Sequence, residues 1–186
     1  MDSGSIWSQV NYEVNQNDDA TSVIHQILKA IDQALDAVLP NLKKGIFMTT
    51  PQDESKATYL GKRNPEDGII DWKQSAASIH QLIRATTKPL PGAYTYLGTK
   101  KLVIWNASIS EITNHLGVVG RIVIADAAQG VHVQTGEGLL KIESIEGIEI
   151  DTLKVGNTLG FHFEKEYFKL ADRIATLENQ LKNGNQ

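Results

Sequence analysis

Residues 59–94 read YLGKRNPEDGIIDWKQSAASIHQLIRATTKPLPGAY, and this stretch separates two parts of the chain that differ in hydrophobic periodicity. It begins with a turn cluster at residues 63–68, where Pro65 disfavours a helical conformation at the residue before it and Asp-Gly favours a reversal. Residues 75–86 then carry apolar side chains at helical spacing. The prolines of residues 89–92 end that pattern. We therefore predict a linker helix with helical sequence before it and strands after it.

Residues 93–160 read as short strands separated by turn signals. The expected strands are residues 93–96, 102–109, 120–125, 131–135 and 139–145. In the fourth strand Val131 and Val133 alternate with His132 and Gln134, so we expect His132 to face outward. Strands of this length, with a turn signal about every 8–12 residues, are typical of a small antiparallel barrel or sandwich.

The sequence before residue 59 predicts one strand and one long helix. Alternating apolar residues favour a strand at residues 5–14, and apolar residues at helical spacing from Ile24 to Leu39 favour an amphipathic helix. We expect Pro40 to end this helix and Lys43-Lys44-Gly45 to close it. A lone strand and helix leave a sheet edge and a helix face uncovered, which is typical of a piece of a larger fold.

The tail forms a separate predicted helix from residue 160 onward. Its apolar residues are spaced 4-3-4-3-4 and are Phe163, Tyr167, Leu170, Ile174, Leu177 and Leu181. Two readings are open: the helix docks along the chain's own barrel, or it pairs with another copy. We expect docking, because a coiled coil normally requires about three or four sustained heptads.

The composition narrows the class of protein. The 186 residues include no cysteine and carry a net charge of −4 at pH 7. The lack of cysteine excludes a disulfide framework, thiolate metal sites and a cysteine nucleophile. No apolar run has the length of a membrane span, and no signal-peptide pattern is seen, so we expect a soluble, cytoplasmic protein. Residues 56–141 carry ten Lys and Arg against six Asp and Glu, a modest excess that favours a phosphate-bearing partner or reflects an ordinary surface.

A string of motifs in this chain resembles a known family. It comprises Arg63-x-Pro65-Glu66-Asp67-Gly68-x-Ile70-Asp71-Trp72, Ile83-Arg84-Ala85 and Pro89-x-Pro91-Gly92-Ala93. In this order the motifs resemble the methionyl-tRNA formyltransferase-like family where its catalytic domain meets its C-terminal barrel. The family uses formyl-tetrahydrofolate to formylate amines, and the string is most similar to members that formylate nucleotide-linked amino sugars. The resemblance covers roughly residues 1–160.

The resemblance implies an α+β fold with four parts. Residues 1–55 would be a strand-and-helix remnant of the catalytic α/β domain, and residues 56–92 a linker with a helix. Residues 93–160 would form a small OB-like antiparallel β-barrel, and residues 161–186 a C-terminal helix.

The resemblance also implies one catalytic residue, Asp2. The segment MDSGSI at residues 1–6 resembles the family's Asp-x-Gly-x-Ile loop, whose aspartate orients a catalytic histidine. In the family the histidine, an asparagine and the pocket for 10-formyltetrahydrofolate precede this loop. We therefore expect that the chain as given does not catalyse formyl transfer alone. The competing reading of Asp2 is an ordinary terminal residue.

Three cations are candidate substrate-binding residues. Arg63 lies in the turn cluster and could bind phosphate, although pairing with Glu66 or Asp67 is the commoner use of such an arginine. Lys100 and Lys101 in a predicted hairpin could contact a nucleotide or a tRNA backbone, although lysines at turns are usually solvated. The five histidines show no metal-ligand spacing, so we expect no metal.

Two classes of function remain open. In the first, the chain is the C-terminal portion of a formyltransferase whose acceptor is a nucleotide-linked amino sugar or initiator methionyl-tRNA, or of a formyl-tetrahydrofolate hydrolase. In the second, it is a non-catalytic β-barrel that binds nucleotide, RNA or protein, with a homodimer formed through the C-terminal helix as a further possibility.

Overall fold

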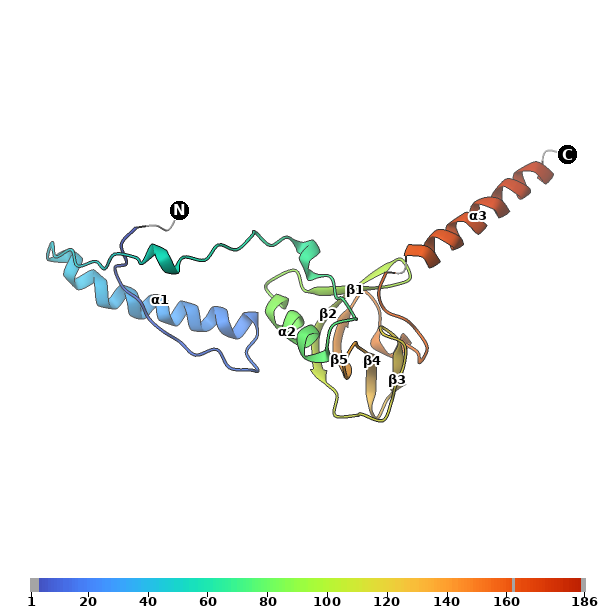
Figure 1. Ribbon diagram of the computed structural model, residues 1–186, viewed down its shortest axis with the longest axis horizontal. Coiled ribbons are helices and arrows are strands. Elements are labelled where there is room, and N and C mark those ends of the chain that lie inside the picture. The colour runs from blue at the N-terminus through green and yellow to red at the C-terminus, as the bar shows by residue number, and fades with distance from the viewer. Residues whose placement is uncertain (1–3, 162, 185–186) are drawn as a thin grey trace.

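The computed structural model describes residues 4–161 and 163–184. Helix α2 (Ala76–Thr86) packs on a five-stranded antiparallel sheet, and together they form the central body of the molecule. Two longer helices, α1 (Ala20–Lys43) and α3 (Phe163–Gly184), extend from opposite sides of that body (Figure 1). The fold class is therefore α+β, as the sequence predicts.

All five predicted strands are present. They are β1 (Ala93–Leu97), β2 (Lys100–Ile109), β3 (Ile122–Asp126), β4 (Gly130–Gln134) and β5 (Leu139–Glu146). The order across the sheet is β1-β2-β5-β4-β3, and every neighbouring pair is antiparallel. Hence β1 and β3 are the two edges of the sheet.

The strands leave the sheet open, and residues 158–160 bridge its two edges. Leu159 pairs with Leu97 at the end of β1, and Thr158 pairs with Arg121 just before β3. Backbone hydrogen bonds support this link: Gly160 N donates to Tyr96 O at 2.8 Å, and Leu159 N donates to Gly120 O at 2.7 Å. Both edges thus gain backbone partners, which makes the arrangement OB-like.

The core lies between α2 and one face of the sheet. Ile79 and Ile83 of α2 are 2% and 1% exposed, and they pack with the inward residues of β2, β4 and β5. Trp72 is also buried, and its indole N–H donates to Thr95 Oγ1 at 2.9 Å. The segment before α2 also lies close to the β4–β5 turn: Gly136 N donates to Trp72 O at 2.9 Å.

Local capping explains where α2 begins. Ser75 is its N-cap, and the side chain of Ser75 accepts a hydrogen bond from Ser78 N at 3.2 Å. Just upstream, Pro65–Gly68 forms a 3₁₀ turn closed by Asn64 N, which donates to Asp67 Oδ2 at 2.7 Å. The predicted linker helix and turn cluster are confirmed.

The predicted strand at residues 5–14 is wrong. In this region Ile6 and Thr50 exchange two backbone hydrogen bonds of 2.8 and 2.9 Å, forming an isolated bridge. An alternating apolar pattern becomes a strand only where neighbouring strands can pair with it.

Pro40 does not end α1, which continues to Lys43. Proline removes one intrahelical hydrogen bond, but both Pro40 and Asp36 are exposed, so water can satisfy the carbonyl that loses its partner. Gly45, with a φ of 72°, then ends the helical region by donating from its N–H to Leu42 O at 2.9 Å, as expected for Lys43-Lys44-Gly45.

His132 does not face outward, because β4 is covered on both sides. The side chain is 4% exposed, and its Nδ1 and Nε2 lie 2.9 Å from Ser110 Oγ and from Gln129 O respectively. Gln134 on the same strand is buried too and accepts a hydrogen bond from Gly117 N at 3.0 Å. The alternation in β4 thus separates two buried faces.

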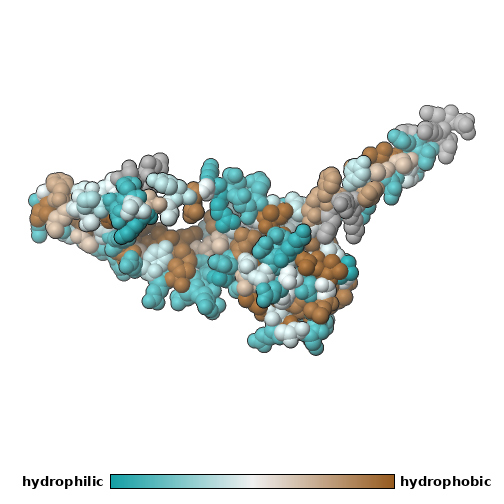
Figure 2. Space-filling view, in the orientation of Figure 1, coloured by the Kyte–Doolittle hydropathy of each residue, from teal (hydrophilic) through white to brown (hydrophobic). Residues whose placement is uncertain are grey.

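The expected docking of α3 along the barrel is also wrong. The helix points away from the sheet, and hydrophobic side chains are visible at the surface of both long helices (Figure 2). Ile174 is 49% exposed, and the other described apolar residues of the seam are exposed as well. Leu181, the last residue of the predicted seam, lies outside the part of the chain whose side chains are described.

Candidate functional site

The sequence-predicted site residues that the structure describes, Arg63, Lys100 and Lys101, make separate contacts. Asp2 lies outside the described residues. Arg63 is exposed and donates from Nη2 to Asp67 O at 3.4 Å, so it spans its own turn. Lys100 is exposed at the first position of β2. These cations therefore do not share one pocket.

Lys101 belongs to an aromatic surface on β1 and β2. Its Nζ lies 3.8 Å from the centre of the Tyr94 ring. The Tyr94 and Tyr96 rings are 5.9 Å apart, and the Tyr96 ring is 5.6 Å from the Phe161 ring. Burial raises the pKa of Tyr94, and the nearby Tyr96 adds to this effect. We call Tyr94, Tyr96, Lys101 and Phe161 the aromatic surface.

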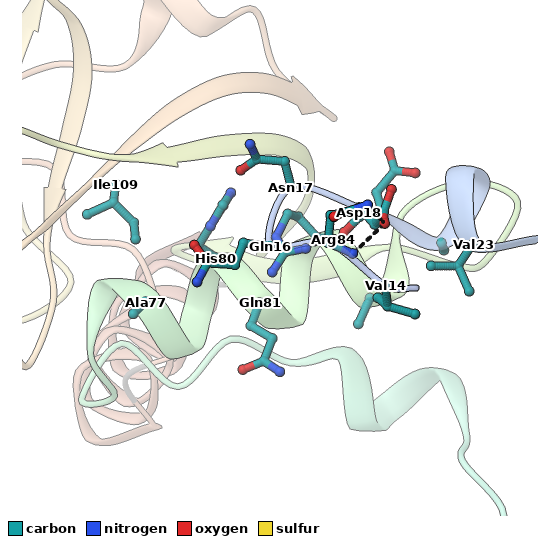
Figure 3. Close-up of a pocket in the computed structure, with 14 residues that line it drawn as sticks. Val14, Gln16, Asn17, Asp18, Val23, Ala77, His80, Gln81, Arg84 and Ile109 are labelled. Atoms are coloured by element: carbon teal, nitrogen blue, oxygen red, sulfur yellow. Dashed lines mark hydrogen bonds between the residues drawn. The ribbon is translucent and has the colours of Figure 1, made fainter. Parts of the chain in front are cut away.

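A separate pocket lies between the loop before α1 and one face of α2. It has a volume of about 790 Å³ and is lined by residues 14–19, by Ile109 of β2 and by α2 residues that include His80, Gln81 and Arg84 (Figure 3). The 3.6-residue period of α2 explains this composition, because Ile79 and Ile83 face the sheet while His80 and Arg84 face away from it. We call this hollow the α1–α2 pocket.

Arg84 connects the two walls of the α1–α2 pocket. Its Nη1 donates to the backbone oxygen of Asp18 (Figure 3). Its Nε–H is buried and, within the part of the chain that the structure describes, has no hydrogen-bond acceptor. A buried donor without an acceptor is costly, so a ligand oxygen at this position would be stabilised.

Asp18 is held in the loop by its own neighbours. Its carboxylate accepts hydrogen bonds from Asn15 N at 2.6 Å, Ser22 Oγ at 2.9 Å and Gln26 Nε2 at 3.2 Å. The hydrogen bond from Asn15 N contributes most to lowering the pKa of Asp18 below its usual value. Asp18 therefore stays ionised and organises the loop.

His80 is the titratable group of α2 in this pocket. Burial lowers the pKa of His80, the positive charge of Arg84 lowers it further, and Glu143 opposes the shift. The imidazole is therefore neutral at pH 7. With Arg84 and the amides of Gln16, Asn17 and Gln81, it gives the pocket several donors and acceptors for a polar ligand.

The pocket does not contain a catalytic histidine–carboxylate pair. None of the described histidines hydrogen-bonds a carboxylate: His115 Nδ1 contacts Asn114 Oδ1, and His132 contacts Ser110 and Gln129. No group of three or more His, Cys, Asp or Glu able to hold a metal ion was found in the described ranges 4–161 and 163–184. No helix in these ranges combines the length and the apolar character of a membrane span.

Comparison with known protein families identifies the family to which this chain belongs. The model of the formyl transferase C-terminal domain matches residues 62–159. The chain belongs to this family. The match begins just before the turn cluster, includes α2 and all five strands, and ends at the segment that bridges the sheet edges. His80 and Arg84 thus lie within the formyl transferase C-terminal domain, while the loop at residues 14–19 lies before it.

Solved structures of HypX from Aquifex aeolicus share the fold. An alanine variant is 22% identical with a TM-score of 0.62 over 77% of this chain and 26% of that chain. The structure in complex with tetrahydrofolic acid is 21% identical with a TM-score of 0.63 over 80% of this chain and 25% of that chain. The chain thus spans about a quarter of the length of the HypX chains that it matches.

The described residues do not fit a folate-dependent catalytic centre. The α1–α2 pocket has a histidine and an arginine, but the carboxylate of Asp18, one of its lining residues, accepts hydrogen bonds from Asn15, Ser22 and Gln26. Among the described residues, this carboxylate does not hydrogen-bond to His80, so it does not orient His80 as a base. No step of formyl transfer is therefore assigned to these residues.

Sequence reasoning missed the α1–α2 pocket. It placed His80 and Arg84 off the apolar face of the linker helix but did not bring them to a common partner. The available signal was their i, i+4 spacing, which puts both on one helix face. The loop at residues 14–19 could not be assigned to that face because it is more than sixty positions away along the chain.

Proposed function

We propose that this chain is the C-terminal portion of an enzyme that transfers the formyl group of 10-formyltetrahydrofolate to an amine on a nucleotide-linked amino sugar. The observation that carries this proposal is the match of residues 62–159 to the formyl transferase C-terminal domain. The likeness to HypX, one structure of which contains tetrahydrofolic acid, supports a folate donor.

The chain by itself is expected to be inactive. In formyl transfer the amine nitrogen attacks the formyl carbon and loses a proton, which requires a base and hydrogen-bond donors for the oxyanion. The histidines in the described ranges lack a carboxylate partner, and His132 has both ring nitrogens engaged. The reaction therefore needs groups from a folate-binding domain.

The α1–α2 pocket supports a role in holding the acceptor. The buried Nε–H of Arg84 requires an oxygen acceptor, and the neighbouring amides suit a sugar or a phosphate. The overall negative charge favours a small nucleotide-linked acceptor over tRNA, because tRNA binding normally needs a strong basic surface. Initiator methionyl-tRNA is the alternative acceptor.

An assay of activity tests the proposal. The chain is incubated with 10-formyltetrahydrofolate and a nucleotide-linked amino sugar, with and without the separately produced folate-binding domain of a relative. We expect formylated sugar, detected by mass spectrometry, only when both polypeptides are present. Turnover by the chain alone would contradict the argument about missing groups, and release of formate without formylated sugar would favour the hydrolase alternative.

A binding measurement tests the acceptor site. Calorimetric titration of the chain with the nucleotide-linked amino sugar should show binding that His80→Gln weakens several-fold. His25→Gln is the matched control, because His25 is exposed on α1 and does not line the pocket. If the two changes weaken binding equally, the α1–α2 pocket does not hold the acceptor.

One observation favours a second candidate function, a non-catalytic nucleotide- or RNA-binding barrel. The aromatic surface combines Lys101 with rings that meet edge to face, and Phe161 is accessible at its exposed side. Bases stack on such rings, and each stacked base contributes about 1–3 kcal/mol to binding. Phe161→Ala should then weaken RNA binding, whereas Phe168→Ala on α3 should not. Strong, salt-sensitive binding of tRNA would shift the acceptor from the amino sugar to tRNA.

A further inference from the structure

Helix α3 carries an apolar seam that is exposed among the residues that the structure describes. Phe163, Tyr167, Leu170, Ile174 and Leu177 follow a 4-3-4-3 spacing and are all exposed. Each of these side chains loses the stabilisation that burial of its apolar area would provide, about 25 cal/mol per Å². Since α3 points away from the sheet, most of its length is open to a second helix (Figure 1).

We propose that α3 pairs with α3 of a second copy of this chain in a parallel two-stranded coiled coil. In heptad notation Tyr167 and Ile174 occupy a positions, and Phe163, Leu170 and Leu177 occupy d positions. A β-branched residue at a with leucine at d favours two parallel strands. The Ile174 layer, flanked by Leu170 and Leu177, is the centre of the interface.

The charges beside this seam are complementary in the parallel arrangement. Arg173 occupies a g position and Glu178 the following e position, so Arg173 of each copy faces Glu178 of the other. The two-fold symmetry gives this pair twice. Within the described part of α3, Glu166 forms an ion pair with Lys169 at 2.8 Å, while neither Arg173 nor Glu178 forms one. These two charges are thus available for a partner.

A fully overlapping antiparallel arrangement lacks this complementarity. Packing Ile174 against Leu170 of the second copy would place Arg173 of one chain beside Arg173 of the other, since g positions face each other across antiparallel helices. Like charges at these flanking positions disfavour that orientation. The charge pattern therefore favours the parallel arrangement over this antiparallel register.

The first turns of α3 also leave room for a second helix. A hollow of about 420 Å³ lies between these turns and the β1–β2 turn, and Thr99, Phe161, Phe163, Tyr167 and Leu170 are among the residues that line it. In the dimer an aromatic side chain from the start of the second α3 would fill this hollow. The seam would then be covered from Phe163 to Leu177.

Sedimentation of the full chain over a dilution series tests the pairing. We expect a reversible monomer–dimer equilibrium that Ile174→Asp shifts to monomer by at least about tenfold in Kd, because a charge at an a position would be buried. Leu35→Asp on α1 is the matched control, since Leu35 and Ile174 are 48% and 49% exposed. A monomeric wild-type chain, or a dimer disrupted by Leu35→Asp and not by Ile174→Asp, would overturn the proposal.

Charge reversal tests the orientation independently of folding. Arg173→Glu and Glu178→Arg should each weaken the dimer, because each places like charges opposite one another. A mixture of these two single variants should form heterodimers, and the double variant should recover the wild-type dimer, because both restore opposite charges. If neither the mixture nor the double variant restores association, the parallel pairing is wrong.

Discussion

Helices α1 and α2 have similar amphipathic patterns, but only α2 buries its apolar face. Ile79 and Ile83 of α2 are almost completely buried against the sheet, whereas α1 buries no residue and leaves Leu35 about half exposed. The difference lies in the neighbours: α2 has the sheet beneath its apolar face, whereas the first turn of α1 lies beside the C-terminal end of α2. Periodicity determines which side of a helix is apolar, and the neighbouring elements decide whether that side is buried.

Hydrogen bonds hold the N-terminal end of α1 in place. Asp19 caps the helix by accepting from Ser22 N at 2.9 Å, and Thr21 Oγ1 donates to Lys88 O at 2.6 Å. Arg84 adds its hydrogen bond to Asp18 O. These bonds hold the first turn of α1 beside α2, but they do not bury its apolar face.

The largest expected contrast is between Trp72 and Leu35. Trp72→Ala should lower the free energy of unfolding of the central body by about 3–5 kcal/mol, because it empties a buried site and leaves Thr95 without its donor. Leu35→Ala should change it by less than about 0.5 kcal/mol. Urea unfolding followed by tryptophan fluorescence and circular dichroism measures both. Comparable losses would show that α1 contributes to the core.

The next largest loss of stability should come from Gly136→Ala, because the backbone of Lys73 lies very close to Gly136. A Cβ at Gly136 would lie 1.9 Å from the carbonyl oxygen of Lys73, whereas a Cβ at Gly61 in the linker would meet nothing within 4 Å. Gly136→Ala should therefore destabilise the central body by about 1–3 kcal/mol. Gly61→Ala is the control and should leave the unfolding midpoint unchanged. A neutral Gly136→Ala would mean that the β4–β5 turn can move away from residue 73.

Removal of a helix cap should have a smaller effect on stability, and the effect should be larger in the central body than in the exposed linker. Ser75→Ala removes the acceptor for Ser78 N and should cost about 1 kcal/mol. Asp53→Ala removes a similar acceptor for Ser55 N in the exposed 3₁₀ turn Glu54–Lys56, and global stability should not change measurably. Thermal unfolding of the two variants measures both effects. A loss of stability for Asp53→Ala as large as that for Ser75→Ala would contradict the prediction.

The smallest expected effect is a pH dependence from His80. Its pKa is lowered in the folded chain, mainly by burial, so below its ordinary value of about 6.5 the unfolded state binds more protons than the folded state. Stability should therefore decrease as the pH falls below about 6.5, until the lower folded pKa is passed. His80→Gln should reduce this slope in denaturant titrations, whereas His25→Gln should not. If the dependence of stability on pH is unchanged in His80→Gln, a group other than His80 causes it.

Much of the central body could be predicted from the sequence. Turn residues such as Pro65 and Gly68, the cap at Ser75 and the alternation within β2 are local signals, and each agrees with the structure. The family resemblance rested on the same segment, and the match at residues 62–159 confirms it. Local signals suffice here because the backbone conformation that they favour is also the one that the sheet stabilises.

The candidate sites were less predictable. Arg63, Lys100 and Lys101 were chosen from local chemistry, yet Arg63 binds its own turn and Lys101 rests on the Tyr94 ring. His132 was expected at the surface and lies in the core, because alternation cannot tell a half-exposed strand from one covered on both faces. The α1–α2 pocket depends on residues 14–19 meeting α2, a contact between distant parts of the chain.

The sequence by itself determined the elements of this protein: the helix at residues 76–86, the five strands, the turns between them and the apolar seam of α3. Only the tertiary structure decided which apolar faces are buried, that residues 158–160 bridge the sheet edges, and that His80 and Arg84 face the loop before α1. The physical reason is the distance along the chain over which each effect acts. Backbone preferences and periodicity act over a few residues, whereas burial and pocket formation depend on which distant segments pack together.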